Sequence, residues 1–318
     1  MAGIKFIEVK SEIGAGTRGA SLGIDALKVA CANRNDDLFL YIHSDEVKNE
    51  DNYLFIKDTN TSAKRIEGVI TMYKRIAKKV ASEVTSESFP IVLAGDHSNA
   101  GGTIAGIKKA YPNKTLGVIW IDAHADMHTP FTTPSGNIHG MPLATALGVD
   151  NIDNKKNEPD FETQASWNNL KNTGNIQPKL RPEHLALIAV RDTEIEEDNL
   201  IAQHGIKNFK VEEVRNKGIE QVVEEIQEQM SACDMIYVSF DVDSMDSSIS
   251  KGTGTPVENG LTVEEAKELV TTLGSLEKTC CVEFTEINPT LDTKNKMAEH
   301  AFMILKALCQ KIDPNYKK

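Results

Sequence analysis

A chain of 318 residues is long enough for one large α/β domain or two smaller ones, and its 40% hydrophobic and 26% charged residues are typical of a globular protein. The formal net charge of −12 argues against nucleic acid and anionic membrane surfaces as partners and is compatible with a cationic substrate or metal ions. The chain has no apolar run that would cross a bilayer, no signal-peptide pattern and no paired cysteines, so we expect a cytoplasmic protein with reduced, mostly buried thiols.

Short apolar runs predict the strands of the fold. In chain order they cover residues 3–9, 38–43, 90–94, 116–121, 185–190, 209–211, 235–240 and 280–285. The stronger runs are almost continuously apolar, as in a parallel sheet that is covered on both faces.

Amphipathic stretches between these runs predict helices over residues 62–86, 219–230 and 295–312. Residues 262–265 (Thr-Val-Glu-Glu) look like a capping box that begins a helix ending near Leu273, with Gly274 as its stop. Strands and helices alternate throughout, which predicts a three-layer α/β/α sandwich with a central, mostly parallel sheet of about eight strands.

Residues 150–182 are polar, rich in Asn and Lys, and only weakly periodic. They could link two domains, although a loop of this length is uncommon inside a compact domain. Because the strands on both sides supply one site, we expect a surface excursion from a single catalytic domain over residues 1–318.

Carboxylates and imidazoles follow the ends of four predicted strands. They lie in Gly-Asp-His-Ser at 95–98, Asp-Ala-His-Ala-Asp at 122–126, Asp-Val-Asp at 241–243 and Glu-Ile-Asn-Pro at 286–289. The carboxyl ends of parallel strands form the ligand crevice of an open sheet, so we expect these four segments to build one site.

Such a cluster would crowd five carboxylates into one cleft and raise their pKa values, unless divalent cations compensated the charge. The set of imidazoles and carboxylates suits Mn²⁺ and, less specifically, Zn²⁺, Fe²⁺ or Co²⁺. In an extended segment Asp-x-His-x-Asp places three ligands on one side. A lone Gly-Asp-His-Ser or Asp-x-Asp is explained about as well by helix capping, so the prediction rests on the motifs occurring together.

Together these motifs resemble those of the arginase (ureohydrolase) family. The resemblance also includes residues 14–19, 135–142 and 252–256, and it runs in order from near residue 10 to near residue 290. It implies an arginase-like fold, a homotrimer or hexamer, and a hydrolase with two Mn²⁺ ions per subunit. Such an enzyme cleaves the guanidinium group of L-arginine to L-ornithine and urea by attack of a metal-bridging hydroxide.

The resemblance also implies the metal ligands. Asp122 and Asp241 would bridge the two ions. The other ligands would be His97 and Asp126 at the first ion, and His124 and Asp243 at the second.

Further roles follow from the same resemblance. Glu286 would pair with the substrate guanidinium, and His139 would be the proton shuttle or general acid to the leaving amine. Asp126 is counted with them as catalytic, and Thr255 would help to position the guanidinium region.

The segment Thr-Thr-Pro-Ser-Gly-Asn at 132–137 fits the pattern that binds the amino-acid carboxylate in arginases. Its neutral donors would be Thr133, Ser135 and Asn137. This segment favours arginine over agmatine, which has no carboxylate.

Two positions depart from the usual arginase pattern. His128 stands where Asn is usual, and we expect it to donate to the substrate carboxylate, or, as a weaker alternative, to contact a metal. Glu194 stands where Asp is usual, and it would meet the substrate α-amino group with support from Asp192 and Glu197. The alternative for the glutamates at 194–197 is an acidic helix start that the helix dipole favours.

Three other functions remain open from the sequence. A related ureohydrolase would act on agmatine, guanidinobutyrate, formimidoylglutamate or another guanidino acid. A two-metal phosphoester hydrolase would need Arg or Lys around the metals, and these motifs supply few. A non-catalytic, metal-dependent binding or regulatory relative should lack a ligand or His139, yet all of them are present.

Overall fold

The computed structural model describes residues 3–86 and 88–316, and their strands form one sheet in the order β2-β1-β3-β8-β7-β4-β5-β6. Each neighbouring pair of strands is parallel. The strands are β1 (Gly3–Val9), β2 (Ser44–Glu46), β3 (Ser88–Ala94), β4 (Leu116–Ile121), β5 (Leu185–Ile188), β6 (Lys207–Phe209), β7 (Met235–Asp241) and β8 (Thr279–Thr285). The predicted α/β class and eight-stranded sheet are therefore confirmed.

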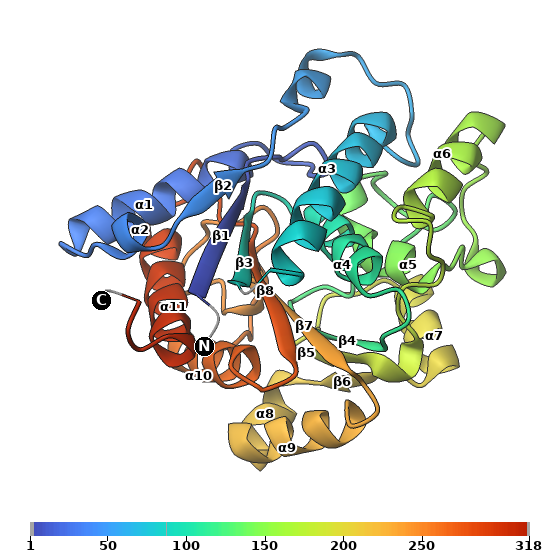
Figure 1. Cartoon of the computed structure of the whole chain (residues 1–318). Coiled ribbons are helices and arrows are strands. Elements are labelled where there is room, and N and C mark those ends of the chain that lie inside the picture. The colour runs from blue at the N-terminus through green and yellow to red at the C-terminus, as the bar shows by residue number, and fades with distance from the viewer. Residues whose placement is uncertain (1–2, 87, 317–318) are drawn as a thin grey trace.

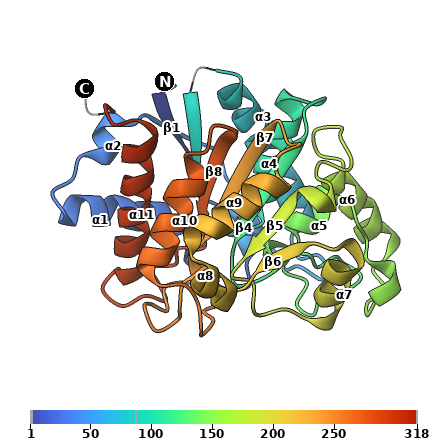
Figure 2. The same ribbon diagram turned by 90° about the horizontal axis from the view of Figure 1, so that it is seen from below.

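Helices cover both faces of the sheet (Figure 1). One face packs against α1 (Gly23–Asn33), α8 (Val211–Lys217), α9 (Ile219–Gln229), α10 (Val263–Gly274) and α11 (Lys296–Ile312). The opposite face packs against α3 (Ile66–Val84), α4 (Asn99–Ala110), α5 (Pro142–Leu147), α6 (Phe161–Lys171) and α7 (Ile195–His204). Figure 2 shows α9, α10 and α11 in front of the sheet, and the three layers are those expected for strands with two apolar faces.

Strands β4 and β7 are buried along their whole length, as the apolar runs in the sequence predict. Every residue of β4 and β7 is buried. Ile119 and Ile121 belong to one core, whereas Val118 and Trp120 belong to the other, because successive side chains of a strand point to opposite faces.

The strand predicted over residues 38–43 is wrong. The segment forms the short helix α2 (Leu38–Tyr41), and the edge strand β2 begins only at Ser44. Asp37 is the N-cap residue of this helix, and the preceding Asp36 accepts hydrogen bonds at Oδ1 from the backbone N–H groups of Asp37 and Leu38. Only Leu38 and Ile42 are buried, at helical spacing, so the apolar composition of the segment concealed a period of four.

Other boundaries differ by a few residues. The strand expected over 209–211 is β6, which ends at Phe209, and the helix expected over 62–86 is α3. The capping box of Thr262 and Glu265 is confirmed, although α10 continues through Gly274. Residues 150–182 contain α6, which packs against α3.

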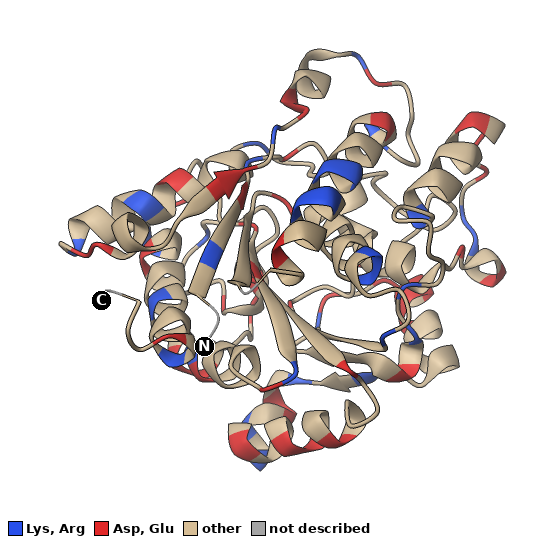
Figure 3. Cartoon of the chain, in the orientation of Figure 1, with Lys and Arg blue, Asp and Glu red and all other residues tan. Residues whose placement is uncertain are grey.

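Acidic and basic side chains are interspersed rather than separated into two faces. In Figure 3 the acidic residues of α9 lie at the lower edge, and basic residues lie along α3. The five cysteines are free thiols, and four of them are buried. Among the helices of the described residues, none is both long and apolar enough to span a bilayer.

Candidate metal centre

The four motif segments meet at the carboxyl ends of four adjacent strands, β3, β8, β7 and β4. His97 follows β3, Glu286 follows β8, Asp241 ends β7, and Asp122 follows β4. The sequence separates these residues widely, and it is the sheet order that brings them together as predicted.

The first candidate site surrounds the Nδ1 atom of His97. This nitrogen lies 2.9 Å from Asp122 Oδ2, 3.0 Å from Asp126 Oδ2 and 3.2 Å from Asp241 Oδ2. His97 Nδ1 and Asp122 Oδ2 are nevertheless buried without a hydrogen-bond partner among the described residues. Buried polar atoms that approach one another without hydrogen-bond geometry are expected where side chains point at a common cation.

The second candidate site lies next to the first and shares Asp122 with it. His124 Nδ1 is 3.4 Å from Asp122 Oδ1 and 3.1 Å from Asp243 Oδ2. Potential ligand atoms of Asp122, His124 and Asp243 all lie within 4.8 Å of one another, as do those of His97, Asp122 and Asp126. Imidazole and carboxylate ligands without a thiolate fit a pair of divalent ions such as Mn²⁺.

Backbone hydrogen bonds orient three of the aspartates. Asp122 Oδ1 accepts from His124 N at 2.7 Å, Asp241 Oδ1 accepts from Asp243 N at 2.8 Å, and Asp243 Oδ1 accepts from Ala123 N at 3.1 Å. In each carboxylate the Oδ2 atom therefore remains to face a histidine and the space where an ion would bind.

The backbone is left-handed at two of the candidate residues, Asp126 with φ 52° and Glu286 with φ 64°. Residues other than Gly seldom adopt this backbone conformation, which costs on the order of 1–3 kcal/mol. Here it turns each carboxylate back towards the end of the sheet, where the other candidate ligands lie.

Trp120 and Ser239 hold the His97 ring. The imidazole stacks on Trp120 with ring centroids 4.0 Å apart and an interplanar angle of 5°. His97 Nε2 lies 2.8 Å from Ser239 Oγ, so an imidazole that offers Nδ1 to a metal can donate its Nε2 proton to this hydroxyl. No sequence motif gives either residue a role, although each precedes an expected ligand by two positions and so faces the same side of its strand.

Without cations, the electrostatics of the centre are unfavourable. Burial raises the pKa of Asp241 and Asp243, and burial with the nearby Asp122 charge raises the pKa of Asp126 to about 6. Burial lowers the pKa of His97, but its three carboxylate neighbours raise that pKa well above its usual value. Protons thus take the place that metal ions would occupy in the loaded protein.

Glu286 and His139 form a pair beside the metal ligands. Glu286 Oε1 accepts from His97 N at 2.9 Å and lies 3.1 Å from His139 Nδ1. Burial lowers the pKa of His139, but the hydrogen bond and charge of Glu286 raise it to about 9. Glu286 Oε2 is buried and has no hydrogen-bond partner among the described residues, so it is the atom that remains for a ligand.

A cavity of about 280 Å³ opens onto this cluster. Asp122 lies beneath it, fully buried, and every other site residue predicted from the sequence lines it. These residues are His97, His124, Asp126, His128, Thr133, Ser135, Asn137, His139, Asp192, Glu194, Asp241, Asp243, Thr255 and Glu286. Thr255 Oγ1 donates to Asp243 Oδ2 at 3.1 Å, and the Asp192 side chain is 65% exposed at the rim.

His128 contacts the acidic start of α7 at the far end of the cavity. Its Nε2 is 2.8 Å from Glu194 Oε2 and 3.4 Å from Glu197 Oε2, and its Nδ1 is 3.2 Å from Thr132 Oγ1. Glu197 accepts from the backbone N–H groups of Met127 and Glu194, at 3.0 and 3.3 Å. Glu194 is thus both the N-cap residue of α7 and part of the cavity wall, so the two interpretations of this acidic segment are compatible.

Comparison with known proteins decides the family. Residues 2–310 match the Arginase family model. The chain is 33% identical over 317 residues to the arginase of Bacillus subtilis, which covers 97% of this chain and 98% of that protein. This protein belongs to the arginase family. The family is one of binuclear metal hydrolases that act on guanidino compounds, and two adjacent ligand groups are therefore the expected arrangement.

Solved structures of arginases share the fold. The native arginase of Bacillus caldovelox superimposes with a TM-score of 0.81 at 34% identity, covering 97% of this chain and 98% of that chain. The Entamoeba histolytica arginase in complex with L-ornithine gives a TM-score of 0.81 at 27% identity, covering 96% and 98%. The arginase-family fold thus extends over nearly the whole chain.

Proposed function

We propose that this arginase-family protein is a dimanganese enzyme that hydrolyses L-arginine to L-ornithine and urea. The observation that carries the proposal is one cavity that brings two kinds of groups together. Its lining includes members of the two candidate ligand groups that share Asp122, Glu286 with its unpartnered Oε2, and the donors of residues 133–137.

His97, Asp122, Asp126 and Asp241 would hold the first ion, and His124, Asp122, Asp241 and Asp243 the second. When bound, such a pair lowers the pKa of water and supplies a nucleophile at neutral pH.

Glu286 binds the guanidinium in this proposal. Its Oε1 is held by His97 N and His139, so its orientation is fixed before a substrate arrives. Its buried Oε2 then accepts a charge-assisted hydrogen bond from a guanidinium N–H, which orients the guanidinium carbon towards the metal side of the cavity.

His139 moves the proton. Its side chain is 21% exposed, so it reaches both the cavity and solvent, while Nδ1 faces Glu286 Oε1. An imidazolium in this place can donate a proton to the leaving amine and recover it from water.

The far end of the cavity suits an α-amino acid. Thr133, Ser135 and Asn137 offer neutral donors to a carboxylate, and Glu194 offers a carboxylate to an ammonium group. The Entamoeba histolytica arginase is described in complex with L-ornithine, an amino acid with these two groups. We therefore favour arginine over decarboxylated guanidino compounds.

A related ureohydrolase activity is the second candidate, because His128 and Glu194 alter the end of the cavity that selects the substrate. Phosphoester hydrolysis is disfavoured, since the described residues that line the cavity include no Lys or Arg. We further propose a single catalytic domain, a homotrimer or hexamer, and a cytoplasmic location.

The test is urea release by the purified, Mn²⁺-loaded protein from L-arginine, agmatine and guanidinobutyrate in parallel. We expect metal-dependent urea from L-arginine, with at least about 100-fold less from a Glu286→Gln variant that still binds two ions. Urea from another guanidino compound alone would refute the arginine assignment, and no urea from any of them would refute a hydrolytic role for these substrates.

A further inference from the structure

The carboxylate-binding loop, residues 129–137, is held by residues 150–157 of the polar excursion. Lys156 N and Asn157 N donate to the carbonyl oxygen of Phe131 at 2.7 and 2.9 Å. The side-chain Nδ2 of Asn157 donates to Thr133 O at 2.7 Å and to Pro130 O at 3.2 Å. Asn157 therefore fixes the backbone from which the Thr133 and Ser135 donors project.

The same segment holds the start of α7, which carries the acidic side of the cavity. Asn151 Nδ2 donates to the carbonyl oxygen of Glu196 at 2.9 Å. Lys156 Nζ forms an ion pair of 2.5 Å with Glu196 Oε1, on a side chain that is only 4% exposed. Residues 150–157 thus connect the loop that would bind a carboxylate to the helix start that would bind an ammonium group.

A second segment, residues 60–64, also contacts the loop, and we call it the brace. Lys64 N donates to Gly136 O at 2.8 Å, and Asn60 Nδ2 ties this brace to Thr163 of α6 at 2.8 Å. Gly136, with φ 74°, allows the close approach, because a Cβ there would lie 2.1 Å from the carbonyl oxygen of Thr61.

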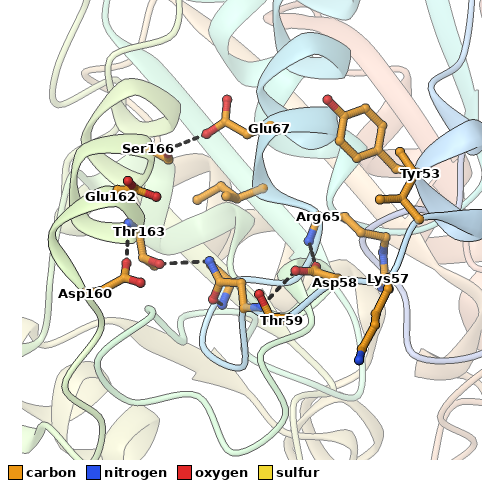
Figure 4. Close-up of a pocket in the computed structure, with 14 residues that line it drawn as sticks. Tyr53, Lys57, Asp58, Thr59, Arg65, Glu67, Asp160, Glu162, Thr163 and Ser166 are labelled. Carbon is orange, nitrogen blue, oxygen red and sulfur yellow. Dashed lines mark hydrogen bonds between the residues drawn. The ribbon is translucent and has the colours of Figure 1, made fainter.

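Between this brace and α6 lies a hollow of about 290 Å³ (Figure 4). Three of its carboxylates already have partners, since Asp58 accepts from Arg65 N, Glu67 from Ser166 and Asp160 from Thr163. We assign no ligand to the hollow, which separates the brace from the helix of the excursion.

We propose that Asn157 is a positioning residue that holds the carboxylate-binding loop to the segment whose Asn151 and Lys156 contact the start of α7, and so selects substrates with an α-amino-acid head group. The inference rests on the proposed function, because it assumes that these two elements bind the two ends of that head group. An amide suits the task, since its two N–H groups reach two carbonyl oxygens, whereas a carboxylate of the same shape would be repelled by both.

The test compares Asn157→Asp with Gln164→Glu. The control makes the same amide-to-carboxylate change in the same excursion, where Gln164 Nε2 donates to Pro159 O at 2.8 Å and not to the loop. For Asn157→Asp we expect the KM for L-arginine to rise about tenfold, with kcat within about twofold and unchanged Mn²⁺ affinity. The Ki of L-ornithine should rise by a similar factor, whereas inhibition by 1,4-diaminobutane, which lacks the carboxylate, should not change.

Asn157→Ala removes the donors without adding charge and should show the same pattern to a smaller extent. A KM and an ornithine Ki equal to those of the control in both Asn157 variants would overturn the inference while leaving the proposed function intact. Equal loss of ornithine and diamine binding would also overturn it, because the effect would then not depend on the head group. A wild-type protein without arginine hydrolysis would refute the proposed function and the inference with it.

Discussion

His128 and Glu194 are hydrogen-bonding partners, with 2.8 Å between Nε2 and Oε2. They are also the two positions at which the sequence departs from the usual arginase pattern. The two changes lie 66 residues apart in the sequence, but in the structure they form a single contact in the cavity wall. The longer acidic side chain and the imidazole in place of an amide thus contact each other directly.

This contact predicts non-additive kinetics. His128→Asn alone leaves the longer Glu194 without its partner and should lower kcat/KM for L-arginine by roughly tenfold. The double variant with Glu194→Asp should recover part of that loss, since it restores the usual pair. A double-mutant cycle on kcat/KM measures the coupling, and strictly additive effects would show that the contact does not bear on substrate binding.

Removing the Ser239 hydroxyl should weaken metal binding without unfolding the protein. The Nε2 atom of His97 would lose its partner at 2.8 Å, and such supporting contacts are typically worth about 10- to 100-fold in metal affinity. Competition with a fluorescent chelator would measure the Mn²⁺ affinity of Ser239→Ala. Ser250→Ala is the matched control, because this buried hydroxyl donates to Asp292 and not to a candidate ligand. Equal affinities in the two variants would contradict the assignment of His97.

The His139–Glu286 pair predicts a pH-dependent contribution to stability in the metal-free protein. The folded pKa of about 9 exceeds the unfolded value of about 6.5. The stabilisation is therefore fully present below pH ~6.5 and is lost as the pH rises through about 9. We expect the Tm of chelated wild type to exceed that of His139→Asn by roughly 2–4 °C at pH 6, with the difference disappearing by about pH 10. A difference independent of pH would exclude this linkage.

Metal removal should destabilise the folded protein. Chelation leaves like charges close together around His97 and Asp122, and a ligand that binds only the native state stabilises it by mass action. We expect the Tm to fall by roughly 5–10 °C on chelation and to recover with Mn²⁺ but not with Ca²⁺, which prefers more oxygen ligands. Calorimetry on dialysed samples measures this effect. An unchanged Tm would argue that bound metal ions do not stabilise the folded protein by compensating the charge of the two clusters.

Most residues of the candidate centre can be picked out from the sequence, because the candidate ligands lie in short motifs directly after buried strands. Asp122 follows β4 and Asp241 ends β7, and both strands are strongly apolar in the sequence. The carboxyl ends of parallel strands lie at one edge of the sheet whatever their order. The order itself, with β7 and β8 between β3 and β4, depends on tertiary packing and leaves no local trace.

The remaining errors share a physical cause, which is that local pattern does not report long-range partners. Residues 38–43 look like a strand by composition, yet residues 38–41 are helical and follow a turn in which Asp36 accepts from the backbone N–H groups of Asp37 and Leu38. Asn157 lies in a polar stretch without any motif, and only the fold places it against Thr133. Trp120 is predicted as a strand residue, but its stacking on His97 brings together residues of β3 and β4, between which two other strands lie in the sheet.

The place of β7 and β8 in the sheet has a consequence for biosynthesis. Until β7 and β8 have been synthesised, β3 and β4 cannot belong to one continuous sheet, because these two strands lie between them. Pairing of such distant segments is slow, since a large loop must close before the contacts form. We expect the complete set of candidate ligands from β3, β4 and β7 to assemble only after residue 285 is available, so that a metal ion would bind after the sheet has formed rather than guide its folding.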